Sequence, residues 1–357
     1  MIEGRREMNN ISISYIGENL IEQKHAGSKA RIDIEVVLNR YLSLLFSIRQ
    51  ASYPRWIDKI KFMMSHESIK TIWDLCLNST KDFVIIQYPF SYNFIFRKLV
   101  TQFIRHHKVI LFVHDVDSLR YGDEKKIKAE INILNSASIV VVHNSKMEKV
   151  LRRYGLKVPA IELQLFDYLV YRGIPKQRYT LGKSIVFAGN LGKSSFLRKI
   201  PGNFLGLHFL LYGIGMPKIL EKETGVQYKG SFRADDLPYN LEGSFGLVWD
   251  GSSLETCDGP LGLYTRFNNP HKLSLYIASG LPVIVWKQSA IADFVKSNRI
   301  GFTVNSLKEI SSKIDSLTNA EYDEMLCNVR VLQSRVTKGF YTKNVLKEIN
   351  NLIETSR

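Results

Sequence analysis

A short segment in the second half of the chain combines a helix start with positive charge. In Phe267-Asn268-Asn269-Pro270-His271-Lys272, Asn269 is a good N-cap residue and Pro270 suits the first helical position. His271 and Lys272 then fall in the first turn, where the helix dipole is already positive, so their charge costs stability unless an anion binds. We predict an anion site here; a fortuitous surface lysine is the alternative.

Two further strand-end loops are candidates for function, and the first carries groups that suit a diphosphate. Gly189-Asn190 directly follows an apolar run, and Lys193 lies just beyond it. A small-residue turn between a strand and a helix presents backbone N–H groups to phosphate oxygens, and the lysine adds charge. A plain turn with a solvated lysine is the alternative. Asp250 opens a long loop that contains Glu255, and such a loop in a compact α/β domain is uncommon without a function.

The first half of the chain offers acid–base groups. His114-Asp115 follows an apolar run, and either side chain could act as a general base at a strand end; loop capping is the alternative. Asp115 and Asp117 also match the D-x-D pattern with which some glycosyltransferases hold a metal–nucleotide complex. Because the lysines above could neutralise a diphosphate without a metal, we expect no metal site and no required divalent cation.

Several common catalytic signatures are absent from the sequence: G-x-x-x-x-G-K-[ST], G-x-G-x-x-G after a strand, H-E-x-x-H and G-x-S-x-G. Their absence argues against an NTPase, a dehydrogenase, a metalloprotease and an α/β-hydrolase. A basic diphosphate site combined with a candidate base is instead typical of a two-domain nucleotide-sugar transferase.

The elements that must position these loops follow an α/β pattern. Short β-branched or aromatic runs alternate with stretches of helical periodicity, which is typical of parallel sheets covered by helices on both faces. Strands are expected at residues 11–16, 83–88, 109–114, 139–143, 185–188, 208–212, 245–249, 282–286 and 302–304. Helices are expected at residues 31–49, 125–135, 145–154, 270–278 and 342–355.

These strands are too many for one compact open sheet, and residues 166–183 have the glycine, proline and charge content of a linker. We predict two Rossmann-like domains facing across a cleft, at residues 8–168 and 182–340, and a C-terminal helix at 341–357 that packs back. Ligands of such sheets bind at the carboxyl ends of the strands. A basic loop before the first helix would project into the same cleft through Gly27, Ser28, Lys29 and Arg31.

The composition and net charge limit the classes of molecule that this protein is expected to bind. The 357 residues carry 49 Lys and Arg against 34 Asp and Glu, and this net charge of +15 favours polyanions such as nucleic acid, phosphorylated small molecules or a membrane face. Nucleic acid is disfavoured because the sequence lacks an RNP-type aromatic stretch and a helix-turn-helix signal. The chain also lacks a long apolar run and a signal-peptide core, so we expect a cytosolic protein without a transmembrane helix.

The motifs together resemble the bacterial family of β-1,6-galactofuranosyltransferases of O-antigen and capsule clusters. More distantly, the chain is similar to the glucosyltransferases that extend the O-glycan of streptococcal serine-rich adhesins. The segments that carry the resemblance are residues 25–31, 114–120, 166–170, 187–191, 245–251, 255–257, 267–272, 292–294, 298–301 and 338–341.

This resemblance implies a GT-B fold, with an acceptor held mainly by the N-terminal half at Gly27, Ser28, Lys29 and Arg31. It implies a UDP-sugar donor held mainly by the C-terminal half, at Gly189, Asn190, Lys193, Tyr212, Asp250, Asn269, His271 and Lys272. Among these, Lys272 and the 190–193 turn would hold the diphosphate, and Tyr212 would lie near the uracil or ribose. The E-x7-E element of many retaining GT-B enzymes is not evident near the basic helix start, which fits an inverting mechanism.

We therefore expect an inverting glycosyltransferase that moves a hexosyl unit, with galactofuranose from UDP-galactofuranose favoured, onto a lipid-linked glycan in surface polysaccharide synthesis. The candidate bases are Asp115, His114 and Glu255, in that order. Basic clusters at residues 97–98, 105–108, 125–128 and 152–153 would dock the protein on the anionic inner face of the cell membrane.

Two other functions stay open. One is a transferase that uses UDP-glucose or another UDP-hexopyranose and acts on a glycan or glycoprotein. The other is a non-catalytic, UDP-sugar-binding partner subunit. The sequence leaves the donor sugar undetermined, because pyranose and furanose donors share the same UDP half. It also leaves the acceptor, the linkage and the formation of homo-oligomers undetermined.

Overall fold

The computed structural model describes residues 12–19, 28–49, 83–90 and 94–356, together with Lys70, Trp73 and Asp74. The described residues fall into two compact units. The first comprises those within residues 1–22, 31–163 and 342–357, and the second comprises those within residues 23–30 and 164–341. Each unit contains one parallel sheet of six strands.

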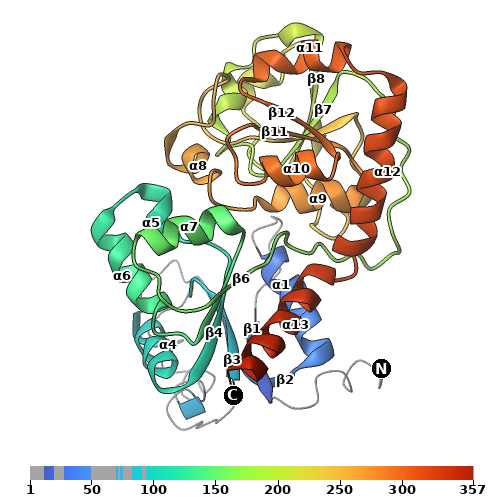
Figure 1. Cartoon of the computed structure of the whole chain (residues 1–357). Coiled ribbons are helices and arrows are strands. Elements are labelled where there is room, and N and C mark those ends of the chain that lie inside the picture. Colours follow the sequence, from blue (N-terminus) through green and yellow to red (C-terminus); the bar gives the residue numbers. More distant parts are fainter. Residues whose placement is uncertain are drawn as a thin grey trace. The chain divides into compact units, whose positions relative to one another are not determined.

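The sheet of the first unit has the strand order β2-β1-β3-β4-β5-β6, with every pair parallel. Its strands are β1 (Ile13–Asn19), β2 (Ser43–Arg49), β3 (Phe83–Tyr88), β4 (Lys108–Val113), β5 (Ile139–Val142) and β6 (Ala160–Glu162). Its helices are α1 (Lys29–Tyr41), α4 (Phe94–His106), α5 (Asp117–Tyr121), α6 (Glu124–Leu134), α7 (Ser145–Arg153) and α13 (Phe340–Thr355). Figure 1 shows α4, α6 and α7 on one side of this sheet and α1 and α13 on the other, as right-handed crossovers in opposite directions from β1 require.

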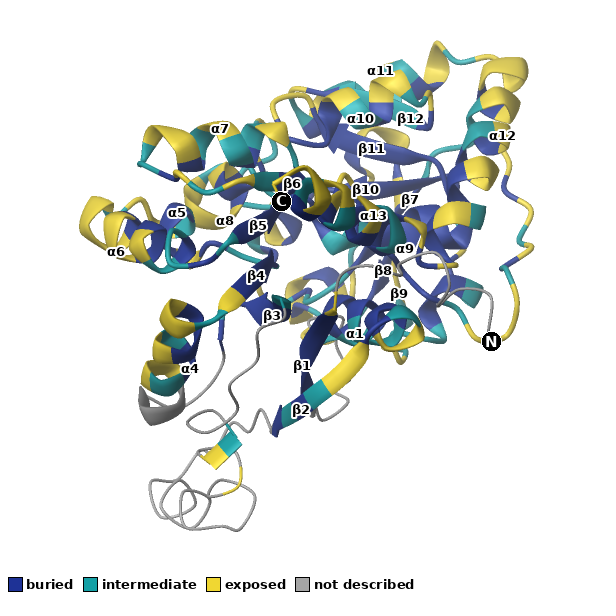
Figure 2. Ribbon diagram, turned by 60° about the horizontal axis from the view of Figure 1, so that its bottom comes forward, coloured by how far each residue is buried: buried dark blue, intermediate teal, exposed yellow. Residues whose placement is uncertain are grey.

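The sheet of the second unit has the order β12-β11-β10-β7-β8-β9, again with every pair parallel. Its strands are β7 (Ser184–Ala188), β8 (His208–Tyr212), β9 (Val226–Gly230), β10 (Phe245–Val248), β11 (Val283–Trp286) and β12 (Gly301–Val304). Its main helices are α8 (Gly259–Tyr264), α9 (His271–Ser279), α10 (Ala292–Ser297), α11 (Ile310–Asp315) and α12 (Asn319–Val336). Apolar residues of the central strands form the core of each unit, and Figure 2 shows these strands buried beneath partly exposed helices.

Each sheet has one point where the chain order reverses. In the first sheet the chain runs outward from β1 to β2 on one side and from β3 to β6 on the other. In the second sheet it runs from β7 to β9 on one side and from β10 to β12 on the other. In open parallel sheets, ligands bind at such a switch point, outside the carboxyl ends of the two strands. The predicted α/β fold is confirmed. A ligand-binding site is expected at the point of reversal in each sheet.

Some predicted elements are wrong. The helix expected over residues 31–49 ends at Tyr41, and residues 43–49 form β2, which pairs in parallel with β1. The apolar run 42–48 continues the helical pattern, but its pairing with the sheet edge decides the outcome. Strands β6 and β9 were not anticipated because β6 has only three residues and β9 is only partly buried. Helix α9 begins at His271 with Pro270 as its N-cap, one residue later than predicted.

Candidate functional site

Lys272 lies at the switch point of the second sheet. It is the second residue of α9, and its Nζ lies 3.2 and 3.3 Å from the two carboxylate oxygens of Asp250, which follows β10. The same ammonium lies 5.1 Å from the ring centroid of Phe187 in β7. Gly189 directly follows β7, and a Cβ there would lie 3.2 Å from Lys272 Cε. The structure thus brings together three of the residues predicted from separate loops.

Tyr276, one turn further along α9, holds the switch point open. The backbones of β7 and β10 pair only at Phe245↔Ile185 and Gly246↔Val186. Beyond this pairing, the Tyr276 hydroxyl accepts a hydrogen bond from Ala188 N at 3.0 Å and donates one to Leu247 O at 3.2 Å. Burial raises the pKa of this phenol, which keeps it protonated and able to do both. Because Lys272 is four residues earlier, it lies on the same face of the helix.

The turns after β7 and β8 are locked to each other through their backbones. Gly189 N donates to Tyr212 O and Leu191 N donates to Ile214 O, each at 2.9 Å. A Cβ at Gly213 would lie 1.8 Å from Gly189 O, so only glycine permits this approach. Asn190 Oδ1 accepts a hydrogen bond from Lys193 N at 3.1 Å, and the Lys193 side chain is exposed. The predicted phosphate turn is therefore a preorganised backbone feature.

The loop after β10 is organised by Asp258, a residue to which the sequence assigned no role. Its carboxylate accepts hydrogen bonds from the amide and hydroxyl of Ser252 and from the amide of Ser253. Partial burial acts to raise its pKa, but these hydrogen bonds outweigh burial and lower it. Asp258 thereby fixes the backbone just after Asp250. Only its position at the end of a Ser-Ser loop could have signalled this role.

The other predicted residues of the α9 start face inward. Asn269 Nδ2 donates to Gln164 O at 2.9 Å. His271 stacks on Tyr168 with ring centroids 5.0 Å apart, and its Nε2 lies 3.4 Å from Asp167 O. Burial lowers the pKa of His271 to about 4, and the charge of Lys29 acts in the same direction. At neutral pH the ring is uncharged, so Lys272 alone carries positive charge in this helix turn.

The side chains of Tyr212 and Glu255 have partners other than Lys272. The Tyr212 ring is buried in the second unit, and its hydroxyl accepts a hydrogen bond from Glu242 N at 3.0 Å. Burial raises the pKa of Tyr212 to about 12. Glu255 is exposed and ion-paired with Lys308, and Ser306 also donates to it, so these contacts lower its pKa.

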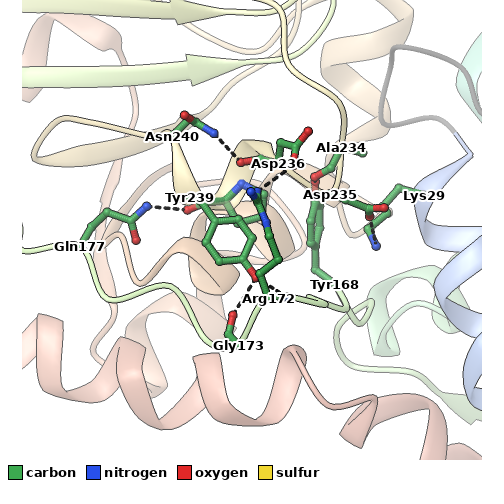
Figure 3. A network of polar contacts seen from close by, with 11 residues as sticks. Lys29, Tyr168, Arg172, Gly173, Gln177, Ala234, Asp235, Asp236, Tyr239 and Asn240 are labelled. Carbon is green, nitrogen blue, oxygen red and sulfur yellow. Dashed lines mark hydrogen bonds and ion pairs between the residues drawn. The ribbon is translucent and has the colours of Figure 1, made fainter.

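Lys29 is buried and belongs to the second unit, and Figure 3 shows its side chain beside Asp235. Its Nζ lies 2.8 Å from an Asp235 carboxylate oxygen and donates to Leu169 O at 3.0 Å. It also lies 5.2 and 5.1 Å from the ring centroids of Tyr168 and Tyr171. These contacts give the Lys29 ammonium a structural role. Ser28 forms the preceding turn, and Gly27 lies outside the described residues.

Residues 166–183, predicted as a linker, are instead part of the second unit. Arg172 pairs with Asp236 at 2.7 Å, and its guanidinium lies 4.4 Å from the Tyr239 ring centroid. The Tyr239 hydroxyl donates to Gly173 O at 2.7 Å, as Figure 3 shows. The segment contains buried aromatic side chains, and the burial of these side chains outweighs the local glycine and proline signals.

A second polar cluster lies at the carboxyl ends of β1, β3 and β4 in the first unit. Arg31 NH1 donates to both carboxylate oxygens of Glu18, at 2.8 and 2.9 Å, and NH2 donates to Pro89 O at 2.7 Å. Gln87, which is 2% exposed, connects Arg31 to His114: its Nε2 lies 3.3 Å from Arg31 O and its Oε1 lies 2.7 Å from His114 Nε2. The sequence analysis missed Gln87, although it is the one polar residue in an otherwise apolar strand.

The two aspartates of the D-x-D pattern share one arginine. Arg120 lies 2.7 Å from an Asp115 oxygen and 3.2 Å from an Asp117 oxygen. Within the described residues, no group of three or more His, Cys, Asp and Glu side chains gathers as a metal-binding cluster.

Among those same residues, no helix is long and apolar enough to cross a membrane.

Two models of one protein family match this chain. The Glucosyltransferase 3-like N-terminal domain matches residues 14–165, and the Glucosyltransferase 3-like C-terminal domain matches residues 185–349. Beta-1,6-galactofuranosyltransferase WbbI of Escherichia coli (strain K12) is 31% identical over 346 residues, which is 96% of this chain and 99% of that protein. Glucosyltransferase 3 of Streptococcus parasanguinis is 28% identical over 246 residues, which is 68% of this chain and 69% of that protein.

Solved structures share the architecture. Sucrose-phosphate synthase from Thermosynechococcus elongatus has a TM-score of 0.64 at 14% identity and covers 98% of this chain and 100% of its own. HepE of Anabaena, in complex with UDP-glucose, has a TM-score of 0.57 at 10% identity and covers 96% of this chain and 99% of its own. At such identities the likeness shows the fold alone, which is GT-B.

Proposed function

Because the chain belongs to the Glucosyltransferase 3-like family of glycosyltransferases, we propose that it transfers a hexosyl unit from a UDP-sugar to a glycan acceptor. Galactofuranose from UDP-galactofuranose is the proposed donor group, because WbbI is similar over nearly the full length of both chains. The two domains proposed from the sequence, residues 8–168 and 182–340, would hold acceptor and donor respectively.

The observation that carries this proposal is the position of Lys272 at the switch point of the second sheet. Its ammonium lies 3.2 Å from an Asp250 carboxylate oxygen, and its Cε would lie 3.2 Å from a Cβ at Gly189, the first residue after β7. A diphosphate placed there would meet the lysine and the positive end of the helix dipole. Lys193, which is exposed beside the turn, would add charge from the solvent side.

In the proposed reaction, a base in the first unit or Glu255 accepts the proton of the acceptor hydroxyl. The hydroxyl oxygen attacks the anomeric carbon in line, with inversion, while the bond to the β-phosphate oxygen breaks and UDP leaves. Lys272 and the helix N-terminus stabilise the charge that develops on the leaving diphosphate. We propose that no divalent cation is needed, since Lys272 supplies this charge and Arg120 occupies both D-x-D carboxylates.

We propose that the acceptor is lipid-linked and that the protein works at the inner face of the membrane. Helices α4, α6 and α7 lie on one side of the first sheet, and Figure 2 shows their outward surfaces exposed. This surface, here the basic face, presents the exposed residues Arg105, Lys125, Lys128 and Arg153. Each basic residue near an anionic leaflet contributes about 1 kcal/mol to docking.

Co-sedimentation with phosphatidylserine-containing liposomes tests the basic face. Replacing all four of its residues by glutamine should abolish sedimentation. Arg152 is left intact because its guanidinium donates to Leu156 O and Val158 O and so supports the fold. The matched control neutralises four exposed lysines of the second unit, Lys199, Lys218, Lys222 and Lys296. Equal loss in both quadruple variants would contradict docking through the basic face.

The transfer proposal is tested by measuring UDP release with a lipid-linked acceptor mimic and each of four donors: UDP-galactofuranose, UDP-galactose, UDP-glucose and UDP-GlcNAc. We expect acceptor-dependent release with UDP-galactofuranose. Preference for UDP-glucose would favour the second candidate, a glucosyltransferase, which the 28% identity to Glucosyltransferase 3 supports. Tight UDP binding with no release from any donor would instead indicate a non-catalytic binding subunit.

A further inference from the structure

The strands β7 and β10 flank the switch point of the second sheet, and they pair at only two positions. The pairs are Phe245↔Ile185 and Gly246↔Val186. Hydrogen bonds are evenly spaced along a parallel pair of strands, so in this register the next one would join Ala188 N to Leu247 O. The Tyr276 hydroxyl is instead hydrogen-bonded to both of these atoms, at 3.0 and 3.2 Å. One oxygen from α9 therefore bridges the two strands at the position where their pairing would continue.

The position of this hydroxyl is fixed by its two hydrogen bonds and by the ring that carries it. A backbone N–H can only donate and a carbonyl can only accept, so the hydroxyl accepts from Ala188 and donates to Leu247. The Tyr276 ring is fully buried and lies against Gly246 of β10, where a Cβ would collide with its ring carbons. A phenylalanine ring could fill the same space, but it could make neither hydrogen bond.

Lys272 lies beside the segments that follow the same two strands. It precedes Tyr276 by four residues, so the two side chains lie on one face of α9. The Lys272 Nζ lies 3.2 Å from an oxygen of Asp250, which is two residues after β10. A Cβ at Gly189, directly after β7, would lie 3.2 Å from the Lys272 Cε. Tyr276 thus connects the ends of the strands, and Lys272 lies beside the residues just beyond them.

We propose that Tyr276 is a positioning residue for the diphosphate site: its hydroxyl holds β7 and β10 apart and thereby sets the position of Gly189 relative to Lys272. This inference rests on the proposed function, because it assumes that the diphosphate of UDP binds at Lys272. Without the hydroxyl, Ala188 N and Leu247 O can satisfy each other only by moving closer together. Gly189 is the next residue after Ala188, so it would move as well and change the space beside the Lys272 ammonium.

Titration calorimetry with UDP and initial rates provide the first test. Tyr276→Phe removes one oxygen and keeps the ring, and UDP should bind about tenfold more weakly. The ratio kcat/KM should fall about 100-fold, the loss expected when a group in the site is misplaced by about 1 Å. The matched control is Tyr322→Phe, because Tyr322 is also buried and its hydroxyl donates to Ser244 O at 2.7 Å, just before β10 begins. A loss of UDP affinity as large in Tyr322→Phe as in Tyr276→Phe would overturn the proposal.

A double-mutant cycle separates positioning from a general loss of stability. General destabilisation would weaken UDP binding by the same factor whether or not the Lys272 ammonium is present. A positioning role leaves little to disturb once the ammonium is gone, so Tyr276→Phe should weaken UDP by less than about twofold in the Lys272→Met background. An equal loss in both backgrounds would show that Tyr276 does not act through Lys272 and would overturn the proposal.

NMR of the wild-type protein provides a test that does not require Tyr276→Phe to fold. In protein labelled with 15N-alanine, the Ala188→Ser variant assigns the amide signal of Ala188. We expect a nuclear Overhauser effect between this amide proton and the hydroxyl proton of Tyr276, because the two heavy atoms are 3.0 Å apart. We also expect saturating UDP to shift the amide signal, since Gly189 directly follows Ala188. Absence of the Overhauser effect, or an unshifted signal with UDP bound, would contradict the proposal.

The outcomes distinguish a failure of this inference from a failure of the proposed function. If UDP binds and the cycle shows coupling but no donor supports transfer, the transferase proposal fails and the positioning role stands. If a folded Tyr276→Phe variant retains the wild-type kcat/KM, the positioning role fails and the transferase proposal stands. If UDP does not bind the wild type, the diphosphate site and the positioning role fail together.

Discussion

Replacing Lys272 by methionine isolates the charge at the proposed diphosphate site. Methionine keeps an unbranched apolar side chain near the Phe187 ring and removes only the ammonium. The ion pair with Asp250 is partly exposed, at 19% for the lysine side chain and 24% for the aspartate. Pairs exposed to this extent contribute about 0–1 kcal/mol to folding, so the variant should remain folded.

The effect on the nucleotide should be much larger than the effect on the fold. A hydrogen bond to a charged group is worth about 1.5–3 kcal/mol, and every 1.4 kcal/mol is tenfold. UDP should therefore bind about 10- to 150-fold more weakly to Lys272→Met. Because negative charge grows on the diphosphate as the sugar leaves, kcat/KM should fall further, by about 10²- to 10³-fold.

Titration calorimetry with UDP and initial rates of UDP release measure these two quantities. The matched control is Lys183→Met. Lys183 directly precedes β7 in the same unit, and its Nζ lies 2.8 Å from an Asp315 carboxylate oxygen, so this variant also breaks a Lys–Asp ion pair. Lys193→Met should weaken UDP by less than about fivefold, because its side chain is exposed and solvent-screened. UDP affinity of Lys272→Met within twofold of the wild type, or no lower than that of Lys183→Met, would refute the diphosphate assignment.

Further predictions concern the backbone, pH and metal. Gly213→Ala should yield insoluble protein, because its Cβ would lie 1.8 Å from Gly189 O. Gly189→Ala should fold yet bind UDP about tenfold more weakly, because its Cβ would lie 3.2 Å from Lys272 Cε. Calorimetry and soluble yield distinguish the two. Burial lowers the pKa of His143 and of His271 to about 4, so the unfolded chain binds protons first as the pH falls below about 6.5. Thermal midpoints should therefore drop between about pH 6.5 and pH 4, and less so in a His271→Asn variant; an unchanged pH dependence would contradict the buried neutral ring. Transfer should continue at the wild-type rate in EDTA, and a rate restored only by Mg²⁺ or Mn²⁺ would contradict metal-free stabilisation of the leaving group.

Local patterns in the sequence predicted five of the six strands of the second unit, all except β9. Apolar runs such as 185–188 and 208–212 are strands within one residue, because a strand buried on both faces needs a continuous apolar run. The same patterns failed at residues 43–49, where an apolar run of helical spacing pairs with β1 instead. Periodicity reports which side chains are buried, and it does not report which sheet edge is available to a short segment.

The residues of the candidate site were likewise predictable only where local sequence was sufficient. The sequence alone placed Gly189 and Asp250 after strands and Lys272 at a helix start, because residue type and position relative to a strand or helix are local properties. It could not tell that His271 is neutral against Tyr168 or that Lys29 is buried beside Asp235. Those facts depend on which distant segments pack together.

Tertiary structure alone decided which polar groups position the others. Tyr276 connects β7 to β10 beyond their strand pairing, and Gln87 connects Arg31 in α1 to His114 after β4. Gln87 is the one amide in an otherwise apolar strand, so the sequence marks it as buried and leaves its partner unknown. Hydrogen-bond geometry is set by atoms brought together from remote positions, and only the folded chain supplies those distances.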